Sequence, residues 1–320
     1  MNSVTAREAA IAGVGESSFE TIPGKSALAF AAEAAHAALS DAGLDKSDID
    51  GVVTAYSVGD PYNFFATVLA EYLGVQPGWL LQINVGGSVG NLLIAHAAQA
   101  IAAGQASTVL CVWADNRRSA LGGDSTVSRV ADLAAHPAYE LPFGPLVPSL
   151  YALVANRYLH EYKQGPEALA DVAVAARAHA ARHPRARRRE LISRDDVLNS
   201  PMVSSPLRAL DCCLISDYGA AAIVTSAERA ADLAKPAVHV LGSGEGTTHE
   251  FISQSPSLVT FGGKRSADTA FARAGMGPAD IDIAYLYDCF TITVLVLLEE
   301  MGFCERGEAA ELAAAGVIGP

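Results

Sequence analysis

The sequence predicts an α/β protein made of two copies of one βαβ unit, and two pairs of matching segments predict this class. The first pair, Ile11–Glu16 and Val240–Glu245, is an apolar run that leads into Gly-x-Gly-Glu. The second pair, Ala42–Leu44 and Ala274–Met276, places Ala-Gly before an apolar residue, with Asp-Ile-Asp a few residues later in both copies. Because the pairs occur in the same order, a duplicated unit is expected.

Each copy is expected to end a helix at its Ala-Gly, because glycine readily adopts the left-handed conformation that closes a helix. The apolar runs that follow, Val52–Tyr56 and Ile283–Tyr287, are predicted strands. In the first copy a helix near Val89–Ala103 and a strand at Thr108–Trp113 come next. The second copy reaches Pro320 before any counterpart of these, so we expect an incomplete, truncated second half.

The repeat divides the chain into two predicted halves, residues 1–235 and residues 236–320. A long insertion at residues 115–200 interrupts the first half. The segment Leu210–Ser226 then closes it.

Composition limits the class of protein further. The 320 residues are 51% hydrophobic and 18% charged, which suits a compact protein with a substantial core. No apolar run reaches the roughly 18–20 residues of a membrane helix, and no leader-like N-terminus is visible. The five cysteines show neither a disulfide framework nor metal-ligand spacing, so a cytoplasmic protein without a metal site is expected. The net charge of −13 argues against non-specific nucleic-acid binding.

The glycine pairs have a second interpretation. Gly13-Val14-Gly15 and Gly242-Ser243-Gly244 are each expected to end a strand in a turn, which is also how a dinucleotide-binding site begins. Both lack the third glycine of that fingerprint, and no acidic residue is clearly placed to hold a ribose. Dinucleotide binding is therefore disfavoured.

Two segments are candidates for ligand binding. Gly86, Gly87 and Gly90, with Ser88 between them, open a predicted helix whose backbone N–H groups could hold a thioester oxyanion. Close helix packing would explain the glycines equally well. In the basic stretch 182–189, Arg185 and Arg188 are candidates for phosphate contacts, and a solvated basic surface is the alternative.

Four further stretches carry a family resemblance: Ser205–Cys213, Ser216–Ala221, Tyr287–Thr291 and Leu297–Cys304. Together with the repeat they resemble the thiolase superfamily, and within it the sterol-carrier-protein-type thiolases and the lipid-transfer-protein-type aldolases. The resemblance runs over essentially the whole chain. It implies the thiolase fold, in which duplicated βαβ half-domains form α/β/α/β/α layers.

Two departures from the thiolase pattern indicate the activity. Gly87 stands where thiolases carry the cysteine that is acylated by substrate, and glycine cannot form an acyl-enzyme. Tyr287 stands where thiolases of this type carry a histidine before Asp-Cys-Phe, and the aldolases that shorten steroid side chains carry tyrosine there. The resemblance therefore implies an aldolase and not a thiolase.

The implied reaction is retro-aldol cleavage of a β-hydroxyacyl-CoA, with a steroid side chain as the family's substrate. It releases a ketone or aldehyde and acetyl- or propionyl-CoA, with coenzyme A as part of the substrate and no tightly bound cofactor. We expect Tyr287 to carry out one proton transfer and Gly87 to help stabilise the enolate. A core tyrosine at the end of a strand is the alternative for Tyr287.

The resemblance also implies partners: a homodimer formed through the first half, and a protein with an OB-fold and a zinc ribbon. It places a second catalytic tyrosine in a C-terminal Gly-Gly-rich loop, which this sequence does not reach.

Two other functions stay open at this point. One is a thiolase-type acyltransferase with an unrecognised nucleophile such as Cys289, although packing is the simpler role for that residue. The other is a non-catalytic subunit that binds acyl-CoA or serves as a scaffold.

Overall fold

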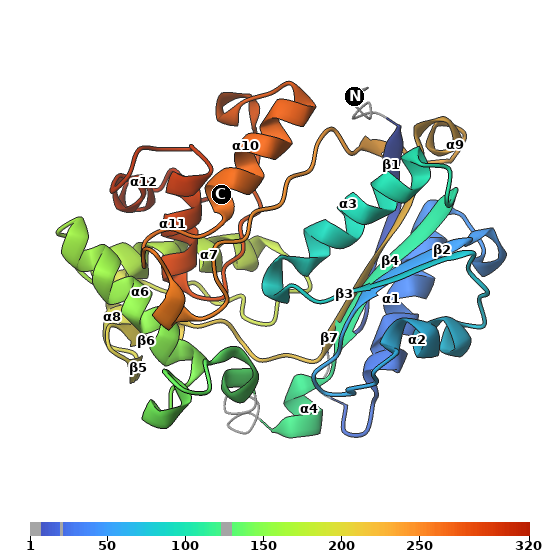
Figure 1. The fold of residues 1–320 in the computed structure, drawn as a ribbon. Coiled ribbons are helices and arrows are strands. Elements are labelled where there is room, and N and C mark those ends of the chain that lie inside the picture. Colours follow the sequence, from blue (N-terminus) through green and yellow to red (C-terminus); the bar gives the residue numbers. More distant parts are fainter. Residues whose placement is uncertain (1–7, 20–21, 123–129) are drawn as a thin grey trace. The chain divides into compact units, whose positions relative to one another are not determined.

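The computed structural model describes residues 8–19, 22–122 and 130–320 (Figure 1). The chain forms two compact units: unit 1 contains residues 1–123 and 215–243, and unit 2 contains residues 124–214 and 244–320. The predicted halves, 1–235 and 236–320, were defined by the internal repeat, whereas these units are defined by compactness. The halves therefore stay a prediction.

Unit 1 is built on a six-stranded sheet with the order β3-β2-β4-β7-β1-β8. Strands β2, β3 and β4 are parallel to one another, and β7 runs antiparallel to both β4 and β1. The strands are β1 (Ala9–Glu16), β2 (Gly51–Ala55), β3 (Trp79–Ile83), β4 (Thr108–Asp115), β7 (Tyr218–Ser226) and β8 (Val238–His239). The predicted strands at 52–56 and 108–113 are confirmed.

Helices cover both faces of this sheet (Figure 1). Successive strand residues point to opposite faces, so Val52 and Leu110 pack with α1 (Ala27–Ala42) and α2 (Phe65–Leu73). Their neighbours Val53 and Val109 pack with α3 (Val89–Ala102) on the other face. Unit 1 also contains α4 (Arg117–Leu121), α9 (Ala227–Ala231) and the 3-10 turns η1 (Lys46–Asp48) and η2 (Gly86–Ser88).

The glycines of β1 have a packing role, so the predicted turn at Gly13 and Gly15 is wrong. Both lie inside the strand and pair with β7. A Cβ atom at Gly15 would lie 2.2 Å from the carbonyl oxygen of Ala34 in α1, and one at Gly13 would lie 2.5 Å from that of Ala38. Glycine is present because the helix backbone lies directly against the strand.

Unit 2 is mainly helical. Helix α11 is buried along most of its length and packs against α6, α7 and α12 through Ile292, Leu295, Val296 and Leu298. Its helices are α6 (Val147–Glu161), α7 (Glu167–Arg182), α8 (Arg194–Leu198), α10 (Gly263–Ala274), α11 (Thr291–Glu300) and α12 (Ala309–Ala314). The smaller elements are η3 (Leu141–Phe143), β5 (Met202–Ser204), β6 (Leu207–Arg208), η4 (Ala209–Asp211), η5 (Ile252–Gln254) and η6 (Pro278–Asp280).

The internal repeat is confirmed at the ends of two helices. Helix α1 ends at Gly43 with φ 69°, and α10 ends at Gly275 with φ 68°. A 3-10 turn follows in both places, and its last aspartate accepts a backbone N–H at 2.8 Å: Asp48 in η1 and Asp280 in η6. Equivalent sequence therefore forms equivalent local structure in both units.

The repeat diverges at the next element, where the predicted strand Ile283–Tyr287 is wrong. No strand is assigned to this segment, and Ile283 and Tyr285 are 73% and 94% exposed. An apolar β-type run becomes a strand only when a neighbour completes its hydrogen-bond ladder. β2 has neighbours on both sides, whereas Ile283–Tyr287 pairs with no strand among the described residues.

Candidate active site

The first candidate region lies at the carboxyl ends of the parallel strands of unit 1. In open α/β sheets, ligands bind outside these ends. Strand β3 leads directly into the turn Gly86–Ser88 and then into α3. The loop 56–60 follows β2 at the same edge, and Asp115 ends β4 there.

The glycines at this helix start are exposed and are not required for packing. Gly86 has φ +71°, a conformation that favours glycine. A Cβ atom at Gly86 or at Gly90 would meet no atom within 4 Å. Ser88 donates to the Val85 carbonyl oxygen at 3.3 Å and does not cap the helix. The alternative of close helix packing is therefore not supported at Gly86 and Gly90, and the first turn of α3 is open to a ligand.

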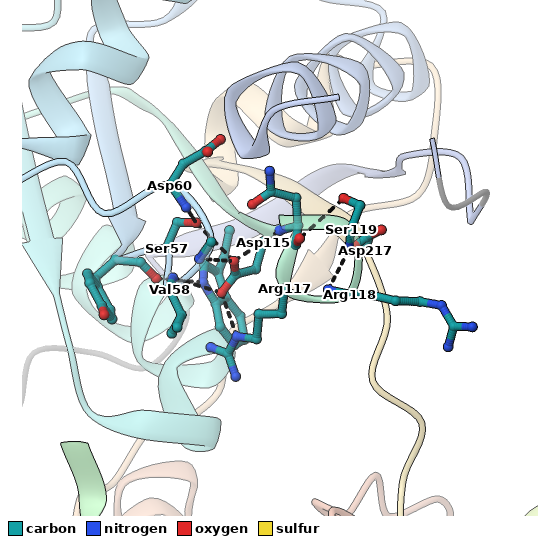
Figure 2. Close-up of polar contacts among 12 residues, drawn as sticks. Ser57, Val58, Asp60, Asp115, Arg117, Arg118, Ser119 and Asp217 are labelled. Atoms are coloured by element: carbon teal, nitrogen blue, oxygen red, sulfur yellow. Dashed lines mark hydrogen bonds and ion pairs between the residues drawn. The ribbon is translucent and has the colours of Figure 1, made fainter. Parts of the chain in front are cut away.

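A buried carboxylate ties the neighbouring strand ends together (Figure 2). Asp115 accepts the Ser57 hydroxyl at 2.9 Å and the N–H groups of Val58 and Gly59 at 3.0 and 2.9 Å. The Arg117 Nε also donates to it at 2.6 Å. These contacts join the loop after β2 to the end of β4. Sequence reasoning missed them, because nothing local links residues so far apart.

A second buried carboxylate fixes the helix that follows β4. Asp217, just before β7, accepts the N–H groups of Arg118 and Ser119 at 2.7 and 3.1 Å, as Figure 2 shows. A carboxylate at a helix start satisfies free N–H groups and interacts favourably with the helix dipole. The stretch Ser216–Ala221 therefore helps to fix the segment that follows β4 in unit 1.

Tyr287 lies in unit 2, just ahead of α11, and is 48% exposed. Its hydroxyl and that of Tyr151 in α6 both interact with the Cys289 thiol and favour its charged form, which opposes the rise in the pKa of that thiol that burial causes. The Tyr151 ring packs against the Phe290 ring, with the two centroids 4.4 Å apart, and this contact holds Tyr151 in place. Tyr287 is thus a half-exposed tyrosine anchored on a buried polar cluster, which differs from the core tyrosine that was the alternative.

Cys289 itself is poorly suited to be a nucleophile. Its thiol is buried and lies 3.4 Å from the Thr293 hydroxyl. Burial raises the pKa of this thiol, although its hydrogen bonds oppose the shift. Because the thiolate is the reactive form, Cys289 is better explained as the centre of the cluster.

Two of the motif stretches of unit 2, Ser205–Cys213 and Tyr287–Thr291, lie side by side and hold this cluster in position. The Cys213 N–H donates to the Cys289 carbonyl oxygen at 3.0 Å, and Cys212 forms a β-bridge with Phe290. The buried Asp211 accepts the Thr291 hydroxyl at 3.0 Å, and burial raises its pKa. The start of α11 is therefore fastened to the stretch Ser205–Cys213.

The remaining candidates lie far from Tyr287 in the sequence. Arg185 and Arg188 are exposed on the stretch that joins α7 to α8 in unit 2. Gly86, Gly87, Ser88 and Gly90 belong to unit 1. Within the described ranges, no cluster of three or more histidine, cysteine or acidic side chains could hold a metal ion. Among the described residues, no helix has the length and apolar character needed to span a bilayer.

Strand β3 leads into a helix that begins with glycines, and the second copy of the repeat ends in Tyr-Asp-Cys-Phe. Together these features define a protein of the thiolase-fold class. Solved structures agree. The "Ltp2-ChsH2(DUF35) aldolase" superposes with a TM-score of 0.86 at 35% identity, over 98% of this chain and 81% of that one. Human mitochondrial 3-ketoacyl-CoA thiolase gives 0.67 at 15% identity, over 98% and 93%, and supports the fold alone. The predicted thiolase fold is confirmed.

Comparisons of sequence identify the branch. Residues 244–320 match the family described as "Thiolase C-terminal domain-like". The "Steroid side-chain-cleaving aldolase" of Thermomonospora curvata is 38% identical, over 98% of this chain and 82% of the relative. The "17-hydroxy-3-oxo-4-pregnene-20-carboxyl-CoA lyase" of Mycobacterium tuberculosis is 34% identical, over 97% and 83%. The chain belongs to the thiolase superfamily, on the branch of these aldolases, and it is a carbon–carbon lyase, as predicted.

Proposed function

We propose that this chain cleaves the bond between the α and β carbons of a β-hydroxyacyl-CoA whose acyl group is a steroid side chain. The observation that carries the proposal is the exposed start of α3, at Gly86 and Gly90, where the family resemblance puts Gly87 at the position of the thiolase nucleophile. A retro-aldol reaction needs no covalent intermediate, so the loss of the nucleophile is compatible with catalysis. The names of the two bacterial relatives support the steroid substrate.

The reaction requires two proton transfers and one stabilised anion. A base removes the β-hydroxyl proton, the α–β bond breaks, and a ketone or aldehyde leaves. The thioester enolate that remains is protonated at its α carbon to give acetyl- or propionyl-CoA. Tyr287 carries out one of these proton transfers. The backbone N–H groups of Gly86 and Gly87, at the start of a helix, stabilise the enolate oxygen, while Ser88 and Gly90 complete the turn that presents them.

Product analysis by mass spectrometry tests this function. The chain, co-expressed with an OB-fold partner, is incubated with a β-hydroxyacyl-CoA that carries a bulky β substituent. Release of a ketone together with acetyl- or propionyl-CoA is the expected result. A matched incubation with a β-ketoacyl-CoA and free CoA is the control, and it should give no thiolysis. Thiolysis without retro-aldol cleavage would contradict the proposal, and no reaction with either substrate would support a non-catalytic subunit.

The CoA portion of the substrate needs cationic contacts. We assign its phosphates to Arg185 and Arg188, because guanidinium groups bind phosphate oxygens in pairs of hydrogen bonds. Both side chains are exposed on a stretch rich in arginine, although the chain as a whole carries a net charge of −13. A weaker affinity for CoA is expected when both residues are changed to alanine, and calorimetry with CoA measures it.

The proposed assembly is a homodimer of this chain together with an OB-fold and zinc-ribbon protein. The name "Ltp2-ChsH2(DUF35) aldolase" includes a second component for that relative, which supports a partner here. The dimer is proposed through β3, the outermost strand of its sheet, whose free edge can pair with another strand. Leu80 on this strand is 39% exposed, and Val85 just beyond it is 47% exposed.

Leu80→Glu is expected to convert the dimer to a monomer. A charged side chain at the edge would be desolvated by a facing strand, which opposes edge-to-edge pairing. Light scattering after size-exclusion chromatography measures the mass. Leu153→Glu is the matched control, since Leu153 is 50% exposed on α6 of unit 2 and should leave the dimer intact. A dimer that persists in Leu80→Glu would place the interface elsewhere.

A further inference from the structure

Unit 2 contains a cavity of about 450 Å³ at the start of α10, which has no part in the proposed reaction. Hydroxyl groups and basic side chains line it together. The hydroxyls come from Thr247, Thr248, Thr260 and Thr269, and the cations are Lys264, Arg265 and Arg306.

Three glycines bring the loop 244–248 against α10 and so build one wall of this cavity. A Cβ atom at Gly246 would lie 2.2 Å from the Gly262 carbonyl oxygen, and one at Gly262 would lie 2.0 Å from that of Gly246. A Cβ atom at Gly244 would lie 2.0 Å from the Ser266 carbonyl oxygen. Only glycine allows backbone to lie this close to backbone. The loop's threonines and the first turn of α10 therefore line one space.

The cavity lining has three cations against two carboxylates, Asp268 and Glu300, so one positive charge is left over. Glu300 is 4% exposed and already accepts the Gly263 N–H at 2.9 Å and an Arg306 guanidinium N–H at 3.1 Å. Asp268 pairs with Lys264 at 3.0 Å, but both side chains are more than 60% exposed, so this pair contributes little. The Arg265 guanidinium makes no hydrogen bond or ion pair with the residues that the structure describes.

The two cations of α10 also occupy an unfavourable place in their helix. Lys264 and Arg265 lie in the first turn of a 12-residue helix that has no acidic residue there and no side-chain cap. The helix dipole disfavours positive charge at this end and favours an anion. A bound anion would therefore interact with the helix start and with both cations at once.

We propose that this cavity binds the phosphate group of a ligand, a binding function beyond carbon–carbon cleavage. Guanidinium groups, an ammonium group and threonine hydroxyls are the donors that a phosphate requires. The phosphate belongs either to the CoA part of the substrate or to a separate phosphorylated molecule. Both sources share the same chemistry at Lys264, Arg265 and Arg306.

Titration with inorganic phosphate tests the site directly, by calorimetry on the full chain at constant ionic strength. Wild type is expected to bind phosphate saturably, and Lys264→Ala/Arg265→Ala to raise the Kd about tenfold or more. Lys163→Ala/Arg273→Ala removes the same charge from exposed positions of unit 2 outside the cavity and should leave this Kd unchanged. Arg265→Lys keeps the charge and should lie between wild type and the double variant. No saturable binding in wild type, or equal weakening by both double variants, would overturn the proposal.

Competition between CoA and inorganic phosphate, together with the KM for acyl-CoA, distinguishes the two sources. If the cavity takes a phosphate of CoA, CoA competes with inorganic phosphate and Lys264→Ala/Arg265→Ala raises the KM for acyl-CoA. If it takes a separate ligand, that variant loses phosphate affinity with an unchanged KM, while Arg185→Ala/Arg188→Ala alone weakens CoA. Phosphate binding needs no turnover, so a failed lyase assay leaves the test of the cavity valid.

Discussion

Tyr287→Phe is expected to lower kcat for retro-aldol cleavage by about 10²–10⁴-fold, which is the usual contribution of a positioned acid or base. The substitution removes only the hydroxyl, so the ring stays and the chain should fold as before. The lost group is the one that interacts with the Cys289 thiol. If that group transfers a proton during the reaction, kcat falls much more than KM rises. Single-turnover formation of the ketone, with mass-spectrometric detection, measures the effect.

Tyr285→Phe is the matched control for this prediction. Tyr285 is two residues away on the same extended segment and is 94% exposed, so its hydroxyl should be dispensable. Circular dichroism and thermal unfolding of both variants should match those of wild type. Near-normal turnover in Tyr287→Phe would remove Tyr287 from the chemistry. An equal loss in both variants would indicate disruption of the segment and not the loss of a proton transfer.

The parts of this fold that depend on local chemistry were predictable from the sequence. Gly43 and Gly275 each end a helix because glycine takes a positive φ at no steric cost. The aspartates of the two 3-10 turns bond to backbone groups three residues away. Such features need only their own neighbours, so the repeat that they form could be recognised before the structure.

The parts that depend on distant partners were not predictable. The segment Ile283–Tyr287 has the composition of a strand, but only a neighbouring strand could make it one. Asp115 and Ser57 are 58 residues apart, and no local sequence pattern predicts their contact. Tyr151 belongs to a helix of the predicted insertion, and only the folded unit brings its hydroxyl to the same sulfur as Tyr287. The glycines and the tyrosine of the candidate site therefore stay a prediction from the sequence, which missed the residues that hold them.

Gly15→Ala is expected to destabilise the protein by about 3 kcal/mol or more, because overpacking against a fixed backbone strains the core. The new methyl group would lie 2.2 Å from both the Ala34 carbonyl oxygen and the Ala38 nitrogen, which are backbone atoms of α1 and cannot rotate away. Strand β1 and helix α1 would have to separate. Thermal unfolding followed by circular dichroism should show a midpoint lower by about 5 °C or more.

Gly90→Ala makes the same chemical change at a site where we expect the protein to become more stable, not less. A Cβ atom there meets nothing within 4 Å, and the position is helical, so alanine should stabilise the protein by about 0.5–1 kcal/mol. The difference between the two variants isolates the effect of helix–strand distance, since the added atom is identical. A Gly15→Ala protein as stable as wild type would show that α1 is not held against β1 at this distance. Loss of stability in Gly90→Ala would show instead that the start of α3 is covered by another surface, and the glycines there would then serve packing and not the enolate.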